Sequence, residues 1–267
     1  MSAWVKKMNS ANRVKSLIAK RQIIKSMAIK NLKGKYVSSA LGISWAIINP
    51  LLIMFAVTFV FTLVMKTEIK HFPLLVLSAL LPWSFFINSI CESTASMKQN
   101  IGMLNQFIIP REAIPISIVL ANFANFLFGF IVMLPIFIIF NTGIFRYLWL
   151  LPLIMFLHFT FALGVSIFFS IVNVYFKDLS QLLNVGVMLW FWLTPIFYPL
   201  TMIPAKYRWI IIINPGTCYV EIYRSLLYRA SGGDMYMWAL AIGFALVSII
   251  IGHALFIRKE AEILKYI

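Results

Sequence analysis

Long, continuous apolar stretches separated by short polar segments constrain this chain more than any other feature of its sequence. A helix needs about 20 apolar residues to cross the hydrocarbon core of a bilayer. Strands of a membrane barrel would instead alternate apolar and polar residues at every second position. The pattern therefore predicts an all-α membrane protein with six transmembrane helices, which span about residues 45–65, 72–91, 115–140, 148–174, 182–198 and 237–257.

The composition excludes a water-soluble enzyme. Hydrophobic residues make up 62% of the 267 residues and charged residues 12%, whereas soluble domains average roughly 45–50% apolar and about 25% charged. Three His and two Cys predict neither a zinc site nor a disulfide framework. The sequence has no G-x-x-x-x-G-K-S/T nucleotide loop. We therefore expect no catalytic residue, metal or cofactor in this chain.

The first 44 residues form a basic arm, which holds ten of the 23 Lys and Arg residues and no acid. Apolar residues at helical spacing, flanked by lysines, predict an amphipathic helix that lies on the inner leaflet. A solvated basic tail is the alternative. The chain thus divides into the arm, residues 1–44, and a transmembrane domain, residues 45–267. The apolar residues of the expected helix are Ile24, Met27, Ala28 and Leu32.

The distribution of positive charge predicts the orientation. With six spans both termini lie on one side, and that side carries sixteen Lys and Arg residues against seven on the other. Cytoplasmic segments are enriched in these residues. We therefore expect a multi-pass protein of the cytoplasmic (inner) membrane with both termini in the cytoplasm, an orientation that depends on the basic arm.

Small and polar residues recur at every third or fourth position in three spans. Lipid tails are as apolar as Leu, so membrane helices associate through such residues. We interpret the stripes as packing faces inside one protomer, with a substrate-lining role as the alternative. They comprise Ser117, Ala121, Asn125 and Gly129; Ala162, Ser166, Ser170 and Asn173; and Ala241, Ala245, Ser248 and Gly252.

Five aromatic residues fall within positions 190–198, near the end of the fifth span. Trp and Tyr commonly form a belt at the membrane surface. Consecutive aromatic residues point all round a helix, however, so some must face a partner helix or a pore. Flat sugar faces stack on aromatic rings, which would suit a pore for glycans. The sequence leaves a belt and a pore lining equally open.

The connection over residues 199–234 is too polar to span a membrane, yet it contains four consecutive Ile residues, 210–213. Asn214-Pro215 breaks it, and residues 219–228 have a helical pattern that includes Glu221 and Arg224. A re-entrant hairpin at the outer face fits this pattern if protein covers its backbone. A simple extracellular loop is the alternative.

No acidic residue lies in the middle of a predicted span, where an ion-coupled transporter would need one. A pump with neither such a residue nor a nucleotide site is expected to take its energy from another subunit. The polar segment 92–112 lies on the expected cytoplasmic side and is compatible with a short helix. We expect this segment to form a helix parallel to the membrane that docks onto that subunit. An ordinary connecting loop is the alternative.

Several motifs, taken in order, resemble those of permease subunits of ABC-2 type exporters, particularly those for O-antigen, capsular polysaccharide and teichoic acid. The resemblance covers nearly the whole chain, and its order and spacing are more specific than any single motif. At 177 a Lys stands where the family pattern has an Arg. The motifs are Lys33-Gly34-Lys35-Tyr36, Leu41-Gly42-Ile43-Ser44-Trp45, Asn49-Pro50-Leu51, Leu80-Leu81-Pro82-Trp83-Ser84-Phe85-Phe86, Pro110-Arg111-Glu112, Val174-Tyr175-Phe176-Lys177-Asp178, Thr194-Pro195-Ile196-Phe197-Tyr198-Pro199 and Asn214-Pro215.

The resemblance implies a homodimer of permeases with two copies of an ABC ATPase subunit, which would hold the ATP and Mg. The cargo would be a polyprenyl-pyrophosphate-linked glycan, moved across the cytoplasmic membrane among its lipids, and no nucleic acid would be bound. The N-terminal amphipathic helix and a coupling helix between the second and third spans would contact the ATPase. The expected coupling residues are Met97, Asn100, Gln106, Pro110, Arg111 and Glu112.

The resemblance further implies a path along the first and fifth spans. Basic residues suit phosphate, so Lys30, Lys33, Lys35 and Arg111 are candidates to receive the pyrophosphate, although attraction to anionic lipid explains the arm equally well. An ABC-2 permease for a lipid, drug or small hydrophobic molecule is the nearest alternative. An ATP-independent flippase or a membrane glycosyltransferase is the other. The expected channel or gate aromatics are Trp45, Phe59, Trp190, Trp192, Phe197 and Tyr198.

Overall fold

The computed structural model describes residues 10–37, 39–66, 68–102 and 110–266, with side chains described between residues 15 and 259. Every regular element in these ranges is a helix, which confirms the all-α class. In chain order the elements are α1 (Ser10–Ala19), α2 (Arg21–Gly34), η1 (Gly42–Ser44), α3 (Trp45–Phe59), η2 (Val60–Val64), α4 (Phe72–Gln99), α6 (Ala113–Phe140), η3 (Thr142–Leu150), α7 (Leu151–Tyr175), α8 (Leu179–Leu193), η4 (Leu200–Met202), α9 (Ala205–Ile213), α10 (Pro215–Leu227) and α11 (Met235–Tyr266).

Five helices in the described part of the chain are long and apolar enough to cross a membrane. They correspond to the predicted first, second, third, fourth and sixth spans. The predicted fifth span, 182–198, overlaps α8, an apolar helix of 15 residues that begins at Leu179 and ends at Leu193. Thr194 is extended, with ψ 133°, because the following Pro195 disfavours a helical conformation for the residue before it. Residues 194–198 are therefore not helical.

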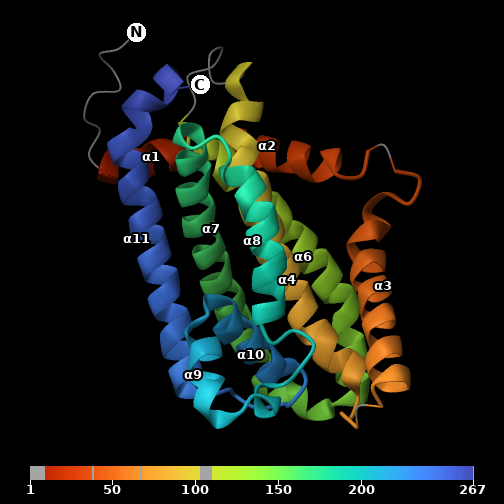
Figure 1. The fold of residues 1–267 in the computed structure, drawn as a ribbon. Coiled ribbons are helices and arrows are strands. Elements are labelled where there is room, and N and C mark those ends of the chain that lie inside the picture. The colour runs from red at the N-terminus through yellow and green to blue at the C-terminus, as the bar shows by residue number, and fades with distance from the viewer. Residues whose placement is uncertain (1–9, 38, 67, 103–109, 267) are drawn as a thin grey trace.

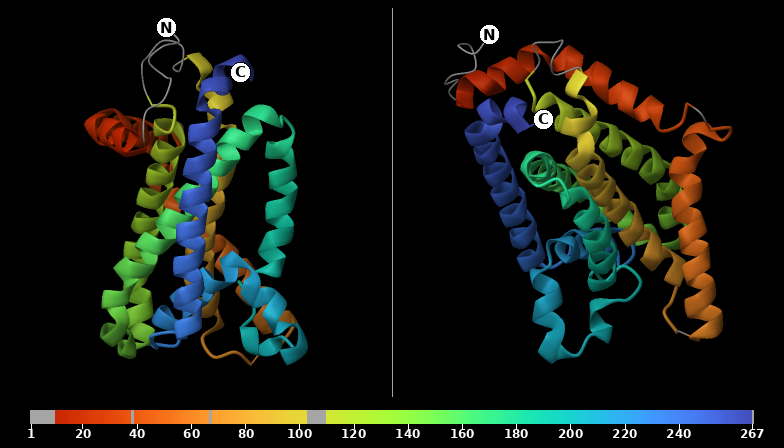
Figure 2. Two further views of the ribbon diagram at one scale, coloured as in Figure 1. Left: turned by 90° about the vertical axis from the view of Figure 1, so that its left-hand side faces the viewer. Right: turned by 45° about the horizontal axis from the view of Figure 1, so that its top comes forward.

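The helices form a bundle with different elements at its two ends (Figure 1). Helices α1 and α2 lie across one end, next to the last turns of α11, and we call this the arm end. Helices α9 and α10 lie at the opposite end, which we call the α10 end. Figure 2 shows that α8 stands away from the rest of the bundle and that α3 lies at its edge.

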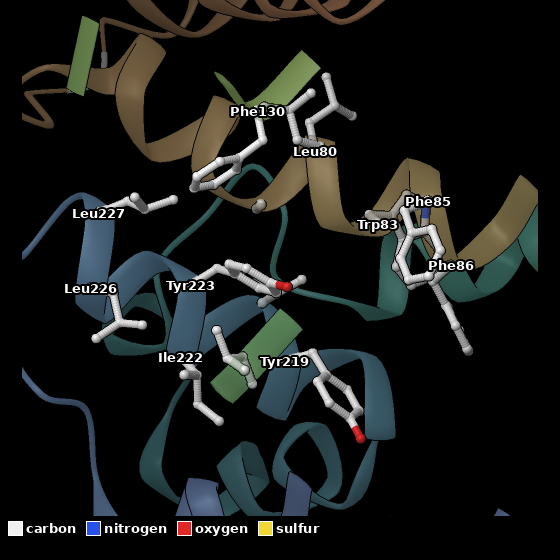
Figure 3. Close-up of a cluster of buried hydrophobic side chains, with 14 of the residues drawn as sticks. Leu80, Trp83, Phe85, Phe86, Phe130, Tyr219, Ile222, Tyr223, Leu226 and Leu227 are labelled. Atoms are coloured by element: carbon white, nitrogen blue, oxygen red, sulfur yellow. The ribbon is translucent and has the colours of Figure 1, made fainter. Parts of the chain in front are cut away.

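Helix α4 is the centre of the core. It packs against α6, α7 and α10, and in its most apolar stretch 83% of the residues are buried. Nearly all of α10 is buried as well. In the close-up of Figure 3, Tyr219 and Tyr223 of α10 lie on the side of α10 that faces α4, which carries Trp83 and Phe86. A segment predicted to be a helix in a polar connection is thus part of the hydrophobic core.

Small residues bring α7 and α11 into close contact, as the stripe on α11 predicts, although Gly164 of α7 is not part of the stripe predicted for its span. A Cβ atom added to Gly164 would lie 2.3 Å from the backbone carbon of Ser248, and one added to Gly252 would lie 2.4 Å from the carbonyl oxygen of Gly164. Real Cβ atoms do not approach a backbone so closely. The absence of a side chain at both glycines therefore lets the two backbones pack directly.

Candidate functional site

A buried network of charges fixes the segment that follows α8 at the α10 end. Arg224 of α10 is fully buried and donates hydrogen bonds to the carbonyl oxygens of Pro195, Ile196 and Tyr198, at 2.6, 3.0 and 3.3 Å. It also pairs with the Glu221 carboxylate at 2.6 Å. One guanidinium thus satisfies three backbone carbonyls of the non-helical segment that follows α8.

The same network includes Arg229, which donates to the second Glu221 oxygen at 2.7 Å. Asn214 adds a further link, because its side-chain oxygen accepts from the backbone N–H of Gly216 at 2.9 Å and caps α10. That oxygen also accepts from the Trp190 indole N–H at 2.6 Å. Two helices and an irregular segment are therefore joined by polar contacts at this end.

The predicted channel aromatics divide into two sets. Trp190 lies edge-on to Trp83 and Phe86, with ring centroids 5.9 and 5.3 Å apart, and Phe197 is buried against Phe61 and Phe191. These two side chains pack within the protomer, and Tyr198 is half-buried beside them. The other set is exposed on the surface of the protomer and comprises Trp45, Phe59 and Trp192.

At the arm end a polar cluster joins the segment after α2 to α4 and α6. The Lys35 ammonium donates to a Glu92 oxygen and to the Asn122 side-chain oxygen, both at 2.6 Å. The Asn122 amide in turn donates to the second Glu92 oxygen at 3.0 Å. Tyr36 donates to the side-chain oxygen of Asn125. Burial, and to a smaller extent the negative charge of Glu92, raise the pKa of Tyr36. The Tyr36 hydroxyl therefore stays protonated and remains a hydrogen-bond donor.

The basic residues proposed to receive a pyrophosphate therefore differ in availability. Lys30 and Lys33 are exposed on α2, whereas Lys35 is already paired with Glu92. Arg111 is half-buried and lies just before α6, at the same end of the bundle. The structure thus places these four residues at one end but does not gather them into one cluster of free cations.

The predicted coupling residues lie where α4 ends and α6 begins, at the arm end. Met97 is fully buried against Ile114 and Ile171, and Asn100 donates to the Ser96 carbonyl at 2.9 Å. Glu112 is buried, with a carboxylate oxygen 3.3 Å from Nδ1 of His253 on α11. Pro110 and Arg111 are half-buried. Gln106 lies outside the described residues, with the rest of 103–109, while residues 92–99 of the segment expected to form the coupling helix continue α4.

Two charged residues that organise the ends of the bundle are not among the residues that the sequence singles out for a site. They are Arg224 at the α10 end and Glu92 at the arm end. The spacing of Glu221 and Arg224, three residues apart on a helix, was a signal for a local ion pair. The contacts with carbonyls of the 195–198 segment depend on tertiary structure, so no local pattern could have revealed them.

Comparisons with known proteins agree with the architecture. The ABC-2 type transporter family matches residues 22–228. The chain is 35% identical to an O-antigen export system permease protein RfbA of Klebsiella pneumoniae, over 88% of this chain and 92% of the relative. It is 28% identical to the RfbA protein of Myxococcus xanthus, over 81% and 84% of the two chains. It is 24% identical to the polysialic acid transport protein KpsM of Escherichia coli, over 90% and 95%. The chain therefore belongs to the ABC-2 type transporter family.

Proposed function

We propose that this chain is the membrane-spanning permease subunit of an ATP-driven exporter that moves a lipid-linked cell-surface polysaccharide across the cytoplasmic membrane. The observation that carries the proposal is the similarity, over most of the chain, to permeases named for O-antigen export and to a polysialic acid transport protein. Both cargoes are polysaccharides. The family is one of transporters, so the chain is a permease subunit and not an enzyme.

The topology proposed for this function has six crossings. Helix α8 supplies the fifth crossing, together with the extended segment that Arg224 holds. Helices α9 and α10 then re-enter the membrane from the outer face and act as an outer gate. The burial of α10 supports this, because a helix inside a membrane needs a backbone that is covered or internally satisfied. The arm end would face the cytoplasm, and α1 and α2, which lie across that end of the bundle (Figure 1), would lie along the membrane surface.

The proposed assembly contains two copies of this chain. Helices α3 and α8 supply the argument, because only 6% of the apolar stretch around α3 is buried and α8 has no buried residue. A second copy that contacts these helices would enclose a path between the protomers. Trp45, Phe59 and Trp192, which are exposed on the protomer, would then line or gate that path.

The arm end would connect this path to ATP hydrolysis in two ABC ATPase subunits, which hold the ATP and Mg. Residues 97–112 and helix α2 lie at this end and would receive the movement of the ATPase. Met97 and Glu112 are packed into the bundle, so they would transmit a displacement, while Arg111 would contact the partner. Lys30 and Lys33 are exposed and would attract the pyrophosphate of the lipid-linked glycan.

Complementation tests this function. The gene is deleted in its host, and surface polysaccharide is measured with a plasmid-borne wild-type copy and with an empty vector. We expect loss of the polysaccharide on deletion and recovery with the wild-type copy. Full surface polysaccharide in the deletion strain would contradict the proposal and favour a permease for a lipid or drug. Unchanged export with a hydrolysis-deficient ATPase partner would contradict ATP-driven transport.

A further inference from the structure

A polar pocket opens between the first span and the core of the protomer, and apart from Trp45 its lining residues have no role in the proposed export path. Its volume is about 300 Å³, at the small end of the range of ligand pockets. Residues from the end of the arm, α3, α4 and α6 line it. Those with polar side chains are Lys35, Tyr36, Asn49, Ser84, Asn88, Asn122 and Asn125, and the aromatic ones are Trp45, Phe85 and Phe126.

The pocket reaches from the arm end into the depth expected for the hydrocarbon core. On α4 the lining runs from Leu81 to Asn88, and Glu92, the partner of Lys35, lies one turn beyond Asn88. Leu81 is eleven residues, or about 16 Å of helix, from Glu92. Asn88 lies between these two residues, and Asn49 lines the pocket from α3. Polar side chains within spans are rare, and they typically face a cavity or a substrate path.

Charge is balanced inside the pocket. Lys35 is paired with Glu92 at 2.6 Å, and the other Glu92 oxygen accepts from Asn122. The Tyr36 hydroxyl donates to the side-chain oxygen of Asn125. No unpaired cation among these described residues is left for a phosphate. The pocket thus favours a neutral ligand.

Two amides remain available for that ligand. Asn49 on α3 and Asn88 on α4 are exposed to the pocket, and neither makes a side-chain hydrogen bond to the described part of the chain. Each amide offers two N–H donors and a carbonyl acceptor. A polar group without a partner in an apolar environment is costly. A ligand that carries several hydroxyl groups would satisfy both amides at once.

The aromatic residues supply the apolar side of the pocket. Phe85 and Phe126 are stacked, with ring centroids 5.5 Å apart, and both are buried, so they form the floor of the pocket. Trp45 lines the pocket and is 38% exposed, and its indole N–H donates to Ser39 at 2.8 Å, which restrains this exposed ring. A sugar ring carries hydroxyl groups on its edge and C–H groups on its face. Amides can bind the hydroxyl groups, and an aromatic ring can pack against the C–H face.

We propose that this pocket binds one sugar ring, with its hydroxyls on Asn49 and Asn88 and one face on Trp45. The location within the membrane indicates a sugar carried by a lipid. On the proposed function, this would be a sugar next to the lipid of the exported glycan, held inside the protomer beside α3 before it enters the path between protomers. A free sugar shares the same chemistry and is distinguished below.

Photolabelling of the full-length protein in lipid nanodiscs tests the site. The probe is dodecyl β-D-glucoside with a diazirine in its alkyl chain, and the matched probe is a dodecylphosphocholine with the same tail. Labelled peptides are identified by mass spectrometry. We expect the glucoside to label peptides of α3, α4 and α6 around the pocket, and the phosphocholine to show no preference for them. Excess glucose should leave the labelling unchanged if the sugar must be lipid-anchored, and should abolish it if a free sugar binds.

Variants separate binding from packing. Asn49→Leu with Asn88→Leu keeps the side-chain size and removes both amides, and it should reduce glucoside labelling about tenfold, as expected for the loss of two hydrogen bonds. Asn49→Gln with Asn88→Gln should retain most of it. Asn184→Leu removes an exposed amide of α8 that does not line the pocket and should have no effect.

Equal labelling by both probes, or glucoside labelling that survives the double Leu substitution, would overturn the proposal. Polysaccharide export is measured separately in the deletion strain. If export were intact but the glucoside did not label the pocket, the sugar site would be rejected and the proposed function would stand. Retained sugar labelling in a protein whose deletion leaves export unchanged would reject the proposed function and keep the site.

Discussion

Two successive spans, α3 and α4, are both strongly apolar yet are packed in opposite ways. The stretch around α3 has a mean hydropathy of 2.4 and is 6% buried, whereas that of α4 has a mean hydropathy of 1.9 and is 83% buried. Helix α4 contacts α6, α7 and α10, while α3 lies at the edge of the bundle (Figure 2). Hydropathy thus indicates that a helix enters the membrane, but not whether protein or lipid surrounds it.

The difference divides the protomer into an internally packed unit and a separate pair of helices. The unit consists of α4, α6, α7, α10 and α11, which share one hydrophobic core. Helices α3 and α8 contribute few buried residues and are available for a second copy. We therefore expect substitutions in the unit to change stability, and substitutions on the exposed faces of α3 and α8 to change transport.

Removal of the buried arginine should have the largest effect on stability. Arg224→Leu leaves three carbonyls at the α10 end without their donor and removes one of the two partners of Glu221. Loss of one member of a buried ion pair costs about 3–5 kcal/mol. Thermal unfolding of the purified protein should show a large decrease in stability.

Lys206→Leu is the control for this prediction, because Lys206 is exposed at the same end of the molecule. Its stability should equal that of the wild type. If Arg224→Leu unfolded at the same temperature as Lys206→Leu, the network would not hold the 194–199 segment, and the division between the packed unit and the exposed helices would be wrong at this end.

A pair of glycine substitutions compares the two regions directly. Gly164→Val places a side chain within 2.3 Å of the α11 backbone, and overpacking typically costs about 1–3 kcal/mol. Gly186→Val on α8 meets no atom within 4 Å, so it should leave the unfolding temperature nearly unchanged. Equal losses in both variants would show that α8 is as tightly packed as α7.

Much of this division follows from the sequence, and the part that does not has a physical reason. The stripe that contains Ser248 and Gly252 predicted a packing face, and the contacts with Gly164 confirm one. The break at Asn214-Pro215 and the helix after it were also predicted. The exposure of α3 could not be predicted, because a helix surface that faces lipid and one that faces protein are equally apolar. The bonds from Arg224 to the 195–198 carbonyls join residues that are 26–29 positions apart.

Aromatic residues on the exposed helices should matter for export more than for folding. Phe59→Ala combined with Trp192→Ala removes two side chains that are 51% and 59% exposed, so the free energy of unfolding should change by less than about 1 kcal/mol. Surface polysaccharide in the deletion strain should nevertheless fall strongly. Phe156→Ala, on a residue of α7 that is 64% exposed, is the matched control and should keep full export. If the double variant exported as much polysaccharide as the control, Phe59 and Trp192 would only contact lipid and would have no role in export.

The ion pair at the arm end should have the smallest energy and the clearest dependence on salt. Lys35 and Glu92 are partly exposed, at 21% and 41% of their side chains, so their coupling should be at most about 1 kcal/mol and should weaken as salt screens it. A double-mutant cycle with Lys35→Gln and Glu92→Gln, read by thermal unfolding at low and high salt, measures this coupling. The same cycle for Arg224→Gln and Glu221→Gln should give a larger coupling that salt barely changes, because that pair is buried. If salt weakened the coupling of Arg224 with Glu221 as much as that of Lys35 with Glu92, ions would reach both pairs equally. The ion pair on α10 would then not be buried inside the protomer, which would contradict the packing described for the α10 end.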